Sequence, residues 1–245
     1  MKRLTEAWFE YKGRKSTDFD ILIQEMPVRQ QPALRGKAKN VSGRHGTVYA
    51  SDGTYEDATV KFGFDVPNPA RIDEINAWLT GSGPMRFSDE PHKLWHVRID
   101  KPYGRESIVS RLDGQRYPAV TLTAQPFKDL YPAADPIIIA TSGDSIVNPG
   151  TAPSNPRIKI TGSGNFSVTI GMETLFFSDV SGGGIIVDSN PNSMDAFTYD
   201  GALLANDHFE GEPFQIQPGE NVVEWQVDDG SGVESVEILP RWRYL

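Results

Sequence analysis

The 245-residue chain contains no cysteine. This absence excludes disulfide bonds and cysteine-ligated metal centres, and it leaves no thiol to act as a nucleophile. The chain also begins without a long apolar run, because MKRLTEAWFEYKG carries several charges. We therefore expect neither a secretory signal peptide nor a membrane span there, and synthesis in a cytoplasm without export through a cleaved signal.

Basic residues are scarce in the second half of the chain. Residues 1–136 hold 20 Lys and Arg against 18 Asp and Glu, a net charge of +2, whereas residues 137–245 hold 4 against 15, a net charge of −11. Such an asymmetry predicts two modules with different surfaces. Because phosphate binding depends on Lys and Arg, the acidic half disfavours direct binding of nucleic acid or anionic lipid.

Signals of catalysis or metal binding are weak. His92 and His96 have the spacing of a helical metal pair, but the alternation around them predicts a strand, and the H-E-x-x-H pattern is absent. The acidic pairs, such as Asp228-Asp229, lack the spaced ligands of a calcium loop. No G-x-S-x-G elbow is present. We therefore predict no enzymatic activity, no catalytic or metal-binding residues and no cofactor.

The first half of the sequence predicts strands with one helix. Ala58–Val66 shows the clearest alternation of period two, after turns predicted at Gly43–Gly46 and Ser51–Thr54. Alternation before and after Lys12-Gly13 predicts a hairpin between Phe9–Tyr11 and Phe19–Ile23. Pro69 after Asn68, with apolar residues three and four apart, predicts a helix over 69–80. Further strands are expected around Trp95–Ile99 and Val120–Ala124.

The segment Glu25–Lys39 shows no apolar periodicity. It holds two prolines, one glycine and four basic residues. We expect an extended arm or a long loop there.

The second half of the sequence predicts a β-sandwich. The proline-rich zone 126–156 is expected to link two domains, 1–132 and 133–245. Short alternating strands follow, with a turn expected at Gly162–Asn165, a type II turn at Pro218-Gly219 and a hairpin loop at Asp228–Gly232. Trp225 is expected in the core and Trp242 with one exposed face.

The order of these pieces resembles siphophage distal tail proteins over nearly the whole chain. The opening hairpin, the Gly43–Gly46 turn with the strand after it, the helix and the strand near 120 resemble the N-terminal domain of that family. The matching pieces of the C-terminal domain are Asn148–Pro153, Gly162–Asn165, Pro218–Asn221 and the ending Pro240–Arg243. The case depends on order and spacing, since no single motif is specific.

The resemblance implies a fold that is mainly β with one helix: a β-rich, ring-forming N-terminal domain followed by a galectin-like β-sandwich. It implies a structural role in a phage tail tip or baseplate, as a homo-hexameric ring that joins the tail tube to the hub and docks host-adsorption proteins. The implied partners are the tube protein, the hub or tail-associated protein and a receptor-binding protein, with DNA only passing through the lumen. The implied location is the virion, after synthesis in the host bacterial cytoplasm.

A ring requires a heterologous interface that closes by rotation. A basic arm is suited to wrapping a neighbour, so we predict a subunit interface that includes Arg29, Arg35, Lys37, Arg44 and His45. The alternative function is a carbohydrate-binding adhesin-type module without a ring. Sugar-binding galectins carry His-x-Asn-x-Arg and Trp-x-x-Glu strands, which the sequences after His208 and Trp225 do not match. We therefore expect a protein-docking domain that favours a basic partner and has no affinity for lactose.

Overall fold

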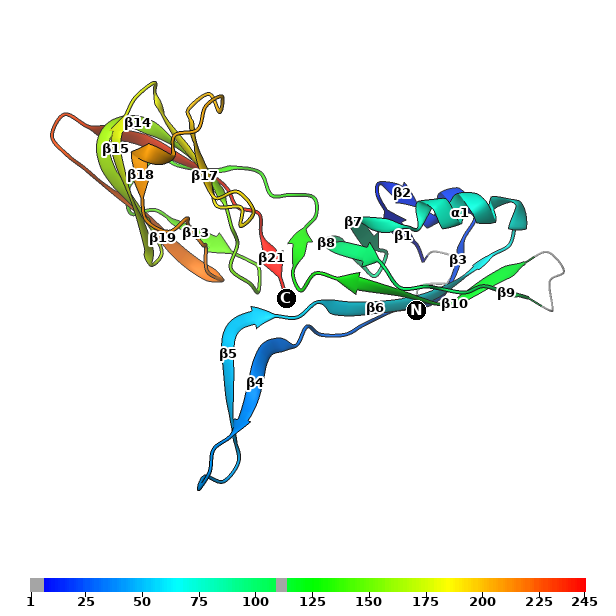
Figure 1. Cartoon of the computed structure of the whole chain (residues 1–245). Coiled ribbons are helices and arrows are strands. Elements are labelled where there is room, and N and C mark those ends of the chain that lie inside the picture. The colour runs from blue at the N-terminus through cyan, green and yellow to red at the C-terminus, as the bar shows by residue number, and fades with distance from the viewer. Residues whose placement is uncertain (1–6, 109–113) are drawn as a thin grey trace. The chain divides into compact units, whose positions relative to one another are not determined.

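The computed structural model describes residues 7–108 and 114–245. The chain divides into two compact units, Met1–Lys128 and Asp129–Tyr244, with the terminal Leu245 grouped with the first. We call them unit 1 and unit 2. Both consist mainly of β-strands, and α1 (Ile72–Trp78) is the one α-helix among the described residues, so the predicted fold class is confirmed (Figure 1).

Unit 1 is built on an antiparallel sheet with the strand order β2-β1-β7-β8-β10-β6-β3, to which β9 adds by pairing with β10. The predicted strands around Ala58–Val66, Trp95–Ile99 and Val120–Ala124 are confirmed as parts of this sheet. Its strands are β1 (Phe9–Tyr11), β2 (Arg14–Lys15), β3 (Leu22–Arg29), β6 (Ala58–Val66), β7 (Gly81–Phe87), β8 (Glu90–Ile99), β9 (Glu106–Ser107) and β10 (Gln115–Ala124).

The helix packs on one face of this sheet through an aromatic stack. It begins where predicted: Asn68 Oδ1 accepts a hydrogen bond from the Ala70 N–H, and a 3₁₀ turn over Pro69–Arg71 leads into α1. Trp78 lies between two rings, with centroid distances of 5.5 Å to Phe9 and 4.3 Å to Phe19. Burying rings of this size gives unit 1 much of its hydrophobic core.

The opening hairpin is shorter than predicted. Lys12 and Gly13 both have positive φ, the geometry of a two-residue turn that fixes a tight register, and they join β1 to β2. The segment Phe19–Ile23 was predicted as the second strand, and this is wrong. Phe19 ends a 3₁₀ helix (Ser16–Phe19), and Ile23 pairs with Phe64 of β6.

Unit 2 consists of two halves of one continuous sheet. The first half has the order β12-β20-β14-β16-β17 and the second has the order β13-β19-β14-β15-β18. The strands are β12 (Ile137–Ile139), β13 (Ser145–Asn148), β14 (Arg157–Ile170), β15 (Glu173–Val180), β16 (Gly184–Asp188), β17 (Asp195–Thr198), β18 (Phe209–Glu210), β19 (Gly219–Val227) and β20 (Gly232–Leu239). Two short strands, β11 (Lys128–Leu130) and β21 (Arg243–Tyr244), flank this set.

The two units divide between Lys128 and Asp129, inside the proline-rich zone 126–156, but most of this zone is folded and belongs to unit 2. It contains β11, β12 and β13, and Ile139 and Ile146 are buried in the core of unit 2. Proline is tolerated in this zone because the prolines lie between the short strands and not within them.

Strand β14 belongs to both halves of the sheet, so the turn predicted at Gly162–Asn165 is wrong. Its first part pairs with β16 and β20, and its second part pairs with β15 and β19. Strands β19 and β20 both run antiparallel to β14, and β20 continues along β14 where β19 ends. The Asp228–Gly232 region between them therefore does not reverse the chain direction and is not a hairpin loop. Strands that pass between sheets in this way bend at bulges.

Close approach of backbones requires glycine at this bend. A Cβ on Gly162 would lie 2.4 Å from the Gly232 carbonyl oxygen, and a Cβ on Gly184 would lie 1.9 Å from that of Ile160. Both distances are far below van der Waals contact. The glycines that looked like turn residues in the sequence are therefore needed for packing between neighbouring strands.

The C-terminal segment closes unit 2. The Arg243 carbonyl oxygen accepts hydrogen bonds from the N–H groups of Thr151 (3.1 Å) and Ala152 (3.3 Å). Trp242 is 4% exposed and lies in the core, which corrects the expectation of an exposed face. Two separate segments of the resemblance, Asn148–Pro153 and Pro240–Arg243, thus contact each other.

We predict that Gly162→Ala lowers the free energy of unfolding by about 1–3 kcal/mol, because the new methyl group must displace the Gly232 backbone. Gly232→Ala is the matched control, since a Cβ there meets nothing within 4 Å; its effect should stay within about 0.5 kcal/mol. Urea unfolding of both variants measures the difference. Equal effects would contradict the close-approach argument.

Candidate subunit interface

The segment Leu34–Tyr55 forms a two-stranded ladder that we call the arm. It consists of β4 (Leu34–Asn40), a turn, and β5 (Thr47–Tyr55), which pair with each other and with no other strand of the described chain (Figure 1). Of the two alternatives expected for Glu25–Lys39, the long loop is therefore wrong, because both ends of this segment lie in strands, and the extended arm agrees with β4. Every residue of β4 is exposed, which explains why no apolar periodicity marked it.

A bulge occupies the place of the second predicted turn. Leu34 pairs with Tyr55 but Gly36 pairs with Ser51, so three residues of β5 lie opposite one residue of β4. Asp52 stabilises the bulge, because its Oδ1 accepts a hydrogen bond from the Thr54 N–H at 2.9 Å. The interpretation of Ser51–Thr54 as a separate turn is therefore wrong, although the local turn chemistry was recognised.

The two faces of the arm differ in character. Side chains alternate along a strand, so Arg35, Lys37 and Lys39 share one face. On the other face the Tyr49 ring lies over Gly36, where a Cβ would come within 2.7 Å of it, and the Tyr49 hydroxyl donates to the Leu34 carbonyl oxygen at 2.7 Å. The arm thus presents a basic face and an aromatic face.

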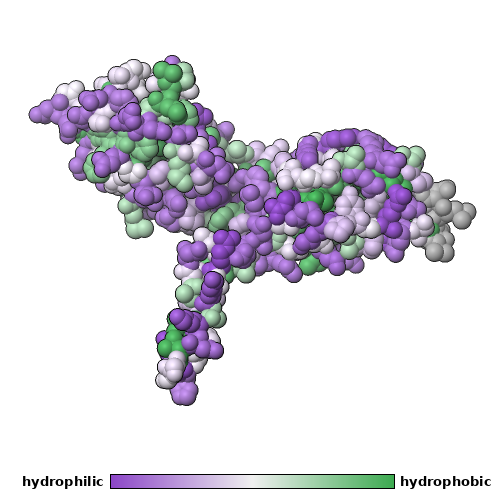
Figure 2. All heavy atoms as spheres, viewed as in Figure 1, coloured by the Kyte–Doolittle hydropathy of each residue, from purple (hydrophilic) through white to green (hydrophobic). Residues whose placement is uncertain are grey.

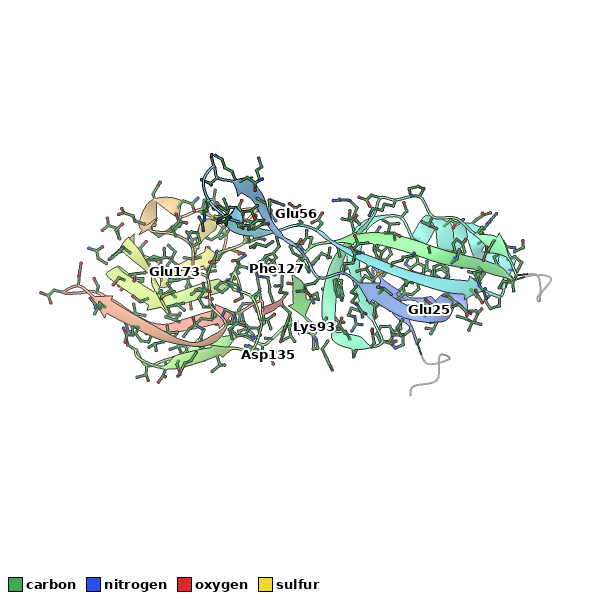
Figure 3. All side chains as sticks on the ribbon, turned by 90° about the horizontal axis from the view of Figure 1, so that it is seen from below. Glu25, Glu56, Lys93, Phe127, Asp135 and Glu173 are labelled. Atoms are coloured by element: carbon green, nitrogen blue, oxygen red, sulfur yellow. The ribbon has the colours of Figure 1, made fainter. Side chains whose placement is uncertain are left out.

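Four of the five predicted interface residues lie on the arm. Arg35 and Lys37 belong to β4, and Arg44 and His45 lie in the turn between the strands. Glu56 lies at the base of the arm (Figure 3). Arg35 pairs with Glu56 at 3.0 Å, and this contact raises the pKa of the guanidinium. Within the described residues, the side chains of Lys37, Arg44 and His45 make no hydrogen bond or ion pair.

Arg29, the fifth predicted residue, lies at the end of β3 and belongs to the body of unit 1. Its guanidinium donates two hydrogen bonds of 2.7 Å to Asp89 and lies 4.9 Å from the Phe87 ring centroid. Burial raises the pKa of Asp89, but the hydrogen bonds from Arg29 outweigh it and hold the pKa below its usual value. Arg29 is thus a packing residue, with a side chain only 18% exposed.

The structure adds residues that the sequence did not single out. Leu34, Val41 and Tyr49 are 41%, 45% and 53% exposed, and Figure 2 shows a hydrophobic patch on the otherwise mainly hydrophilic arm. An isolated two-stranded ladder is marginally stable and leaves two strand edges unpaired. Such an element is typical of a segment that a partner covers. The basic residues at every second position from Arg35 to Lys39 were the signal that could have identified β4.

Other features of unit 1 offer weaker sites. A pocket of about 300 Å³ is lined by residues of several strands, among them Asp57, His96 and Arg98. Arg98 pairs with Asp100 at 2.8 Å, and hydrogen bonds from Arg98 and Thr123 lower the pKa of Asp100. Over residues 7–108 and 114–245, no group of three His, Asp or Glu could hold a metal ion. No helix in the same ranges is long and apolar enough to cross a membrane.

Comparisons with known proteins show that this fold occurs in a solved structure. No protein-family model matches the chain, and the comparison with curated proteins gives no match. A solved structure does match: the crystal structure of Dit (gp 19.1) of SPP1, described as a paradigm of the hub adsorption apparatus in phages that infect Gram-positive bacteria. The match covers 98% of this chain and 99% of that chain, with a TM-score of 0.74 and 16% sequence identity. The predicted resemblance to distal tail proteins is thus confirmed for the fold.

We predict that Arg29→Ala lowers the free energy of unfolding by about 1.5–3 kcal/mol, because it removes hydrogen bonds to a partly buried carboxylate. Arg35→Ala is the matched control. Its ion pair with Glu56 is half exposed on both sides, so its loss should leave stability unchanged. Urea unfolding at neutral pH compares the two variants. A larger loss of stability for Arg35→Ala than for Arg29→Ala would contradict the assignment of Arg29 as the packing residue.

The Asp89 carboxylate should make stability depend on pH. Its pKa is lowered in the folded state, so its contribution is complete above the unfolded pKa of about 3.9 and is lost as pH falls through the folded value. We expect the destabilisation caused by Asp89→Asn to be largest at neutral pH and to shrink below about pH 4. Unfolding measured from pH 7 to pH 3 tests this. A difference that is constant with pH would contradict the pairing.

Proposed function

We propose that the chain is a structural component of a siphophage tail tip. In this proposal six copies form a ring that joins the tail tube to the hub, and unit 2 serves as a docking platform for host-adsorption proteins. DNA passes through the lumen without being recognised. The protein is made in the cytoplasm of the host bacterium and functions in the virion.

The observation that carries the proposal is the match to SPP1 Dit over both units. Its 98% coverage includes the sheet of unit 1, the arm and the sandwich of unit 2 in one alignment. A shared fold alone does not assign a function. Here, however, the matched structure is itself described as a paradigm of a hub adsorption apparatus, and the match spans both units.

The arm supports self-assembly. Its strands have unpaired edges, its turn is basic, and its aromatic face is exposed, so it gains stability if a second molecule covers it. A heterologous contact of this kind, repeated by rotation, generates a closed ring. Arg35, Lys37, Arg44 and His45 are the residues that we assign to this contact, and Arg29 holds the body of unit 1 beside it.

Catalysis is not part of the proposal. Two carboxylates from acidic pairs of the sequence are engaged by arginines: Asp89 of Asp89-Glu90 binds Arg29, and Glu56 of Glu56-Asp57 binds Arg35. A carbohydrate-binding adhesin remains the second candidate. Trp225 is partly buried against the core of unit 2, so its ring is not available as a sugar platform. We expect no binding of lactose or simple cell-wall sugars, and glycan-array binding by the full chain would favour the second candidate.

We predict that the purified protein forms a hexameric annulus in negative-stain images, with a mass in light scattering of six copies of the 27.1-kDa chain. Antibody labelling of phage tails should place it at the tail tip. Replacing residues 34–55 with an Asn-Gly turn should abolish the annulus. The Glu56 N–H donates to the Ala33 carbonyl oxygen at 2.8 Å, so the two ends of the arm are already adjacent and the body should stay folded.

The control for this deletion is Ser193→Ala in the exposed turn after β16, which should assemble like the unmodified chain. Thermal unfolding of the deletion variant should match that of the full chain. A deletion variant that still forms annuli would refute the role of the arm, whereas a full chain that stays monomeric even when tube protein is present would refute the ring.

A further inference from the structure

The outer face of the second half of the unit 2 sheet has an unusual composition. Paired residues lie on the same face of a sheet, so the register gives a row of Glu210, Phe176, Ser167 and Gln226 across β18, β15, β14 and β19. The next row holds Thr174, Thr169 and Glu224, and beyond it on β19 come Val222 and Glu220. We call this surface the acidic face.

The acidic face exposes apolar side chains among carboxylates. Phe176 is 58% exposed, and Val147 and Val222, on neighbouring strands, are 62% and 41% exposed. The side chains of Glu210 and Glu224 make no hydrogen bond or ion pair with the part of the chain that the structure describes. A surface of this kind presents an apolar contact area surrounded by unneutralised negative charge, which is typical of a binding site for a basic partner.

Unit 2 supplies no cation of its own to this face. From Ile160 to Pro240 the sequence contains 14 Asp and Glu and no Lys or Arg. The basic residues near its C-terminus are engaged elsewhere, because Arg241 binds Asp188 at 2.6 Å and Arg243 donates to the Pro153 carbonyl oxygen at 2.8 Å. The charge of the face must therefore be neutralised by solvent ions or by another surface.

The arm has the complementary composition. Residues 34–55 contain four Lys and Arg against one Asp, whereas the rest of unit 1 is close to neutral, with 16 Lys and Arg against 15 Asp and Glu. The arm is thus the basic part of unit 1, and the acidic face carries charge of the opposite sign.

The dimensions agree as well. The seven residues of β4 extend about 24 Å at about 3.4 Å per residue, and five neighbouring strands at about 4.8 Å cover about 19 Å. The arm is thus long enough to cross the sheet.

We propose that the arm of one copy of the chain binds the acidic face of unit 2 in a second copy. The basic face of the arm lies against the acidic face, so that Lys37 and Lys39 approach Glu210 and Glu224. This inference rests on the proposed ring and names the surface that receives the arm. It gives unit 2 a part in assembly in addition to the docking of other proteins.

The absence of cysteine allows a direct test by disulfide cross-linking of the full chain. One variant carries Ala50→Cys on the arm, since Ala50 is exposed and pairs with Lys37 on the basic face, and the other carries Gln226→Cys on the acidic face. Mixed under mild oxidation, the two should form a covalent heterodimer. Ser193→Cys, exposed in unit 2 on the loop between β16 and β17, is the matched control and should cross-link to the arm about tenfold less.

Charge-reversal variants distinguish loss of the proposed contact from misfolding of the chain. Lys37→Glu with Lys39→Glu, or Glu210→Lys with Glu224→Lys, should each reduce cross-linking about tenfold, because like charges then oppose each other. Mixing the arm-reversed chain with the face-reversed chain should restore it, and a misfolded variant could not give this result. Cross-linking should also fall with added salt, since screening acts over about 8 Å at physiological ionic strength.

The outcomes distinguish this inference from the proposed function. If annuli form but the covalent heterodimer does not, the proposed ring is supported and the contact between the arm and the acidic face is refuted. A heterodimer without annuli would support the contact and count against the ring. A disulfide that forms only when both cysteines are in one chain would show an intramolecular contact and overturn the inference. So would charge-reversed acidic faces that cross-link normally while losing capture of a basic tail-tip protein.

Discussion

The close approach of three backbone paths at the bend of β14 is the constraint on which unit 2 depends. Gly162 and Gly184 have no side chain that would push the neighbouring backbones apart. Strand β14 can therefore pass from one half of the sheet to the other while keeping partners on both sides. The bend places Ile158 and Phe166, which lie on either side of it in β14, in the same hydrophobic core. It also leaves one face of each half toward solvent. The acidic face is therefore a consequence of the bend, and its composition can change without altering the core.

Unit 1 separates stability from surface in a similar way. Its core is a sheet with a helix packed through Trp78, and Arg29 covers the edge of that core with its charge neutralised by Asp89. The arm adds exposed strand edges and unpaired cations but little buried area. An element that contributes so little to its own unit persists in a fold when contacts with another molecule stabilise it. This energetic asymmetry is the physical reason for assigning assembly to the arm and stability to the sheet.

Prediction from sequence succeeded where burial imposed a period. The apolar alternation of Ala58–Val66 and the capping residues before Ile72 identified β6 and α1 because core positions repeat every two or about 3.6 residues. Prediction failed at Gly162–Asn165, because residues such as glycine and asparagine occur both in turns and in bulges inside a long strand. It failed for β4 because an exposed strand carries no apolar alternation. Trp242 was misplaced because flanking arginines imply exposure, although Arg241 and Arg243 turn to partners inside unit 2.

The candidate site shows what a sequence leaves open. The basic residues of the arm were recognised by composition, yet only the structure separated Arg29 from the other four, since its partner Asp89 lies 60 residues away in the sequence. The acidic face could not be derived from the sequence, because it depends on the register that aligns Phe176 with Glu210 and Ser167. Net charge indicated a basic partner for unit 2, and the register places three of its carboxylates, Glu210, Glu220 and Glu224, on one face. Since both surfaces belong to the same chain, the proposed contact would give every copy both halves of one interface, and repeated contacts of this kind require either a closed ring or an open filament.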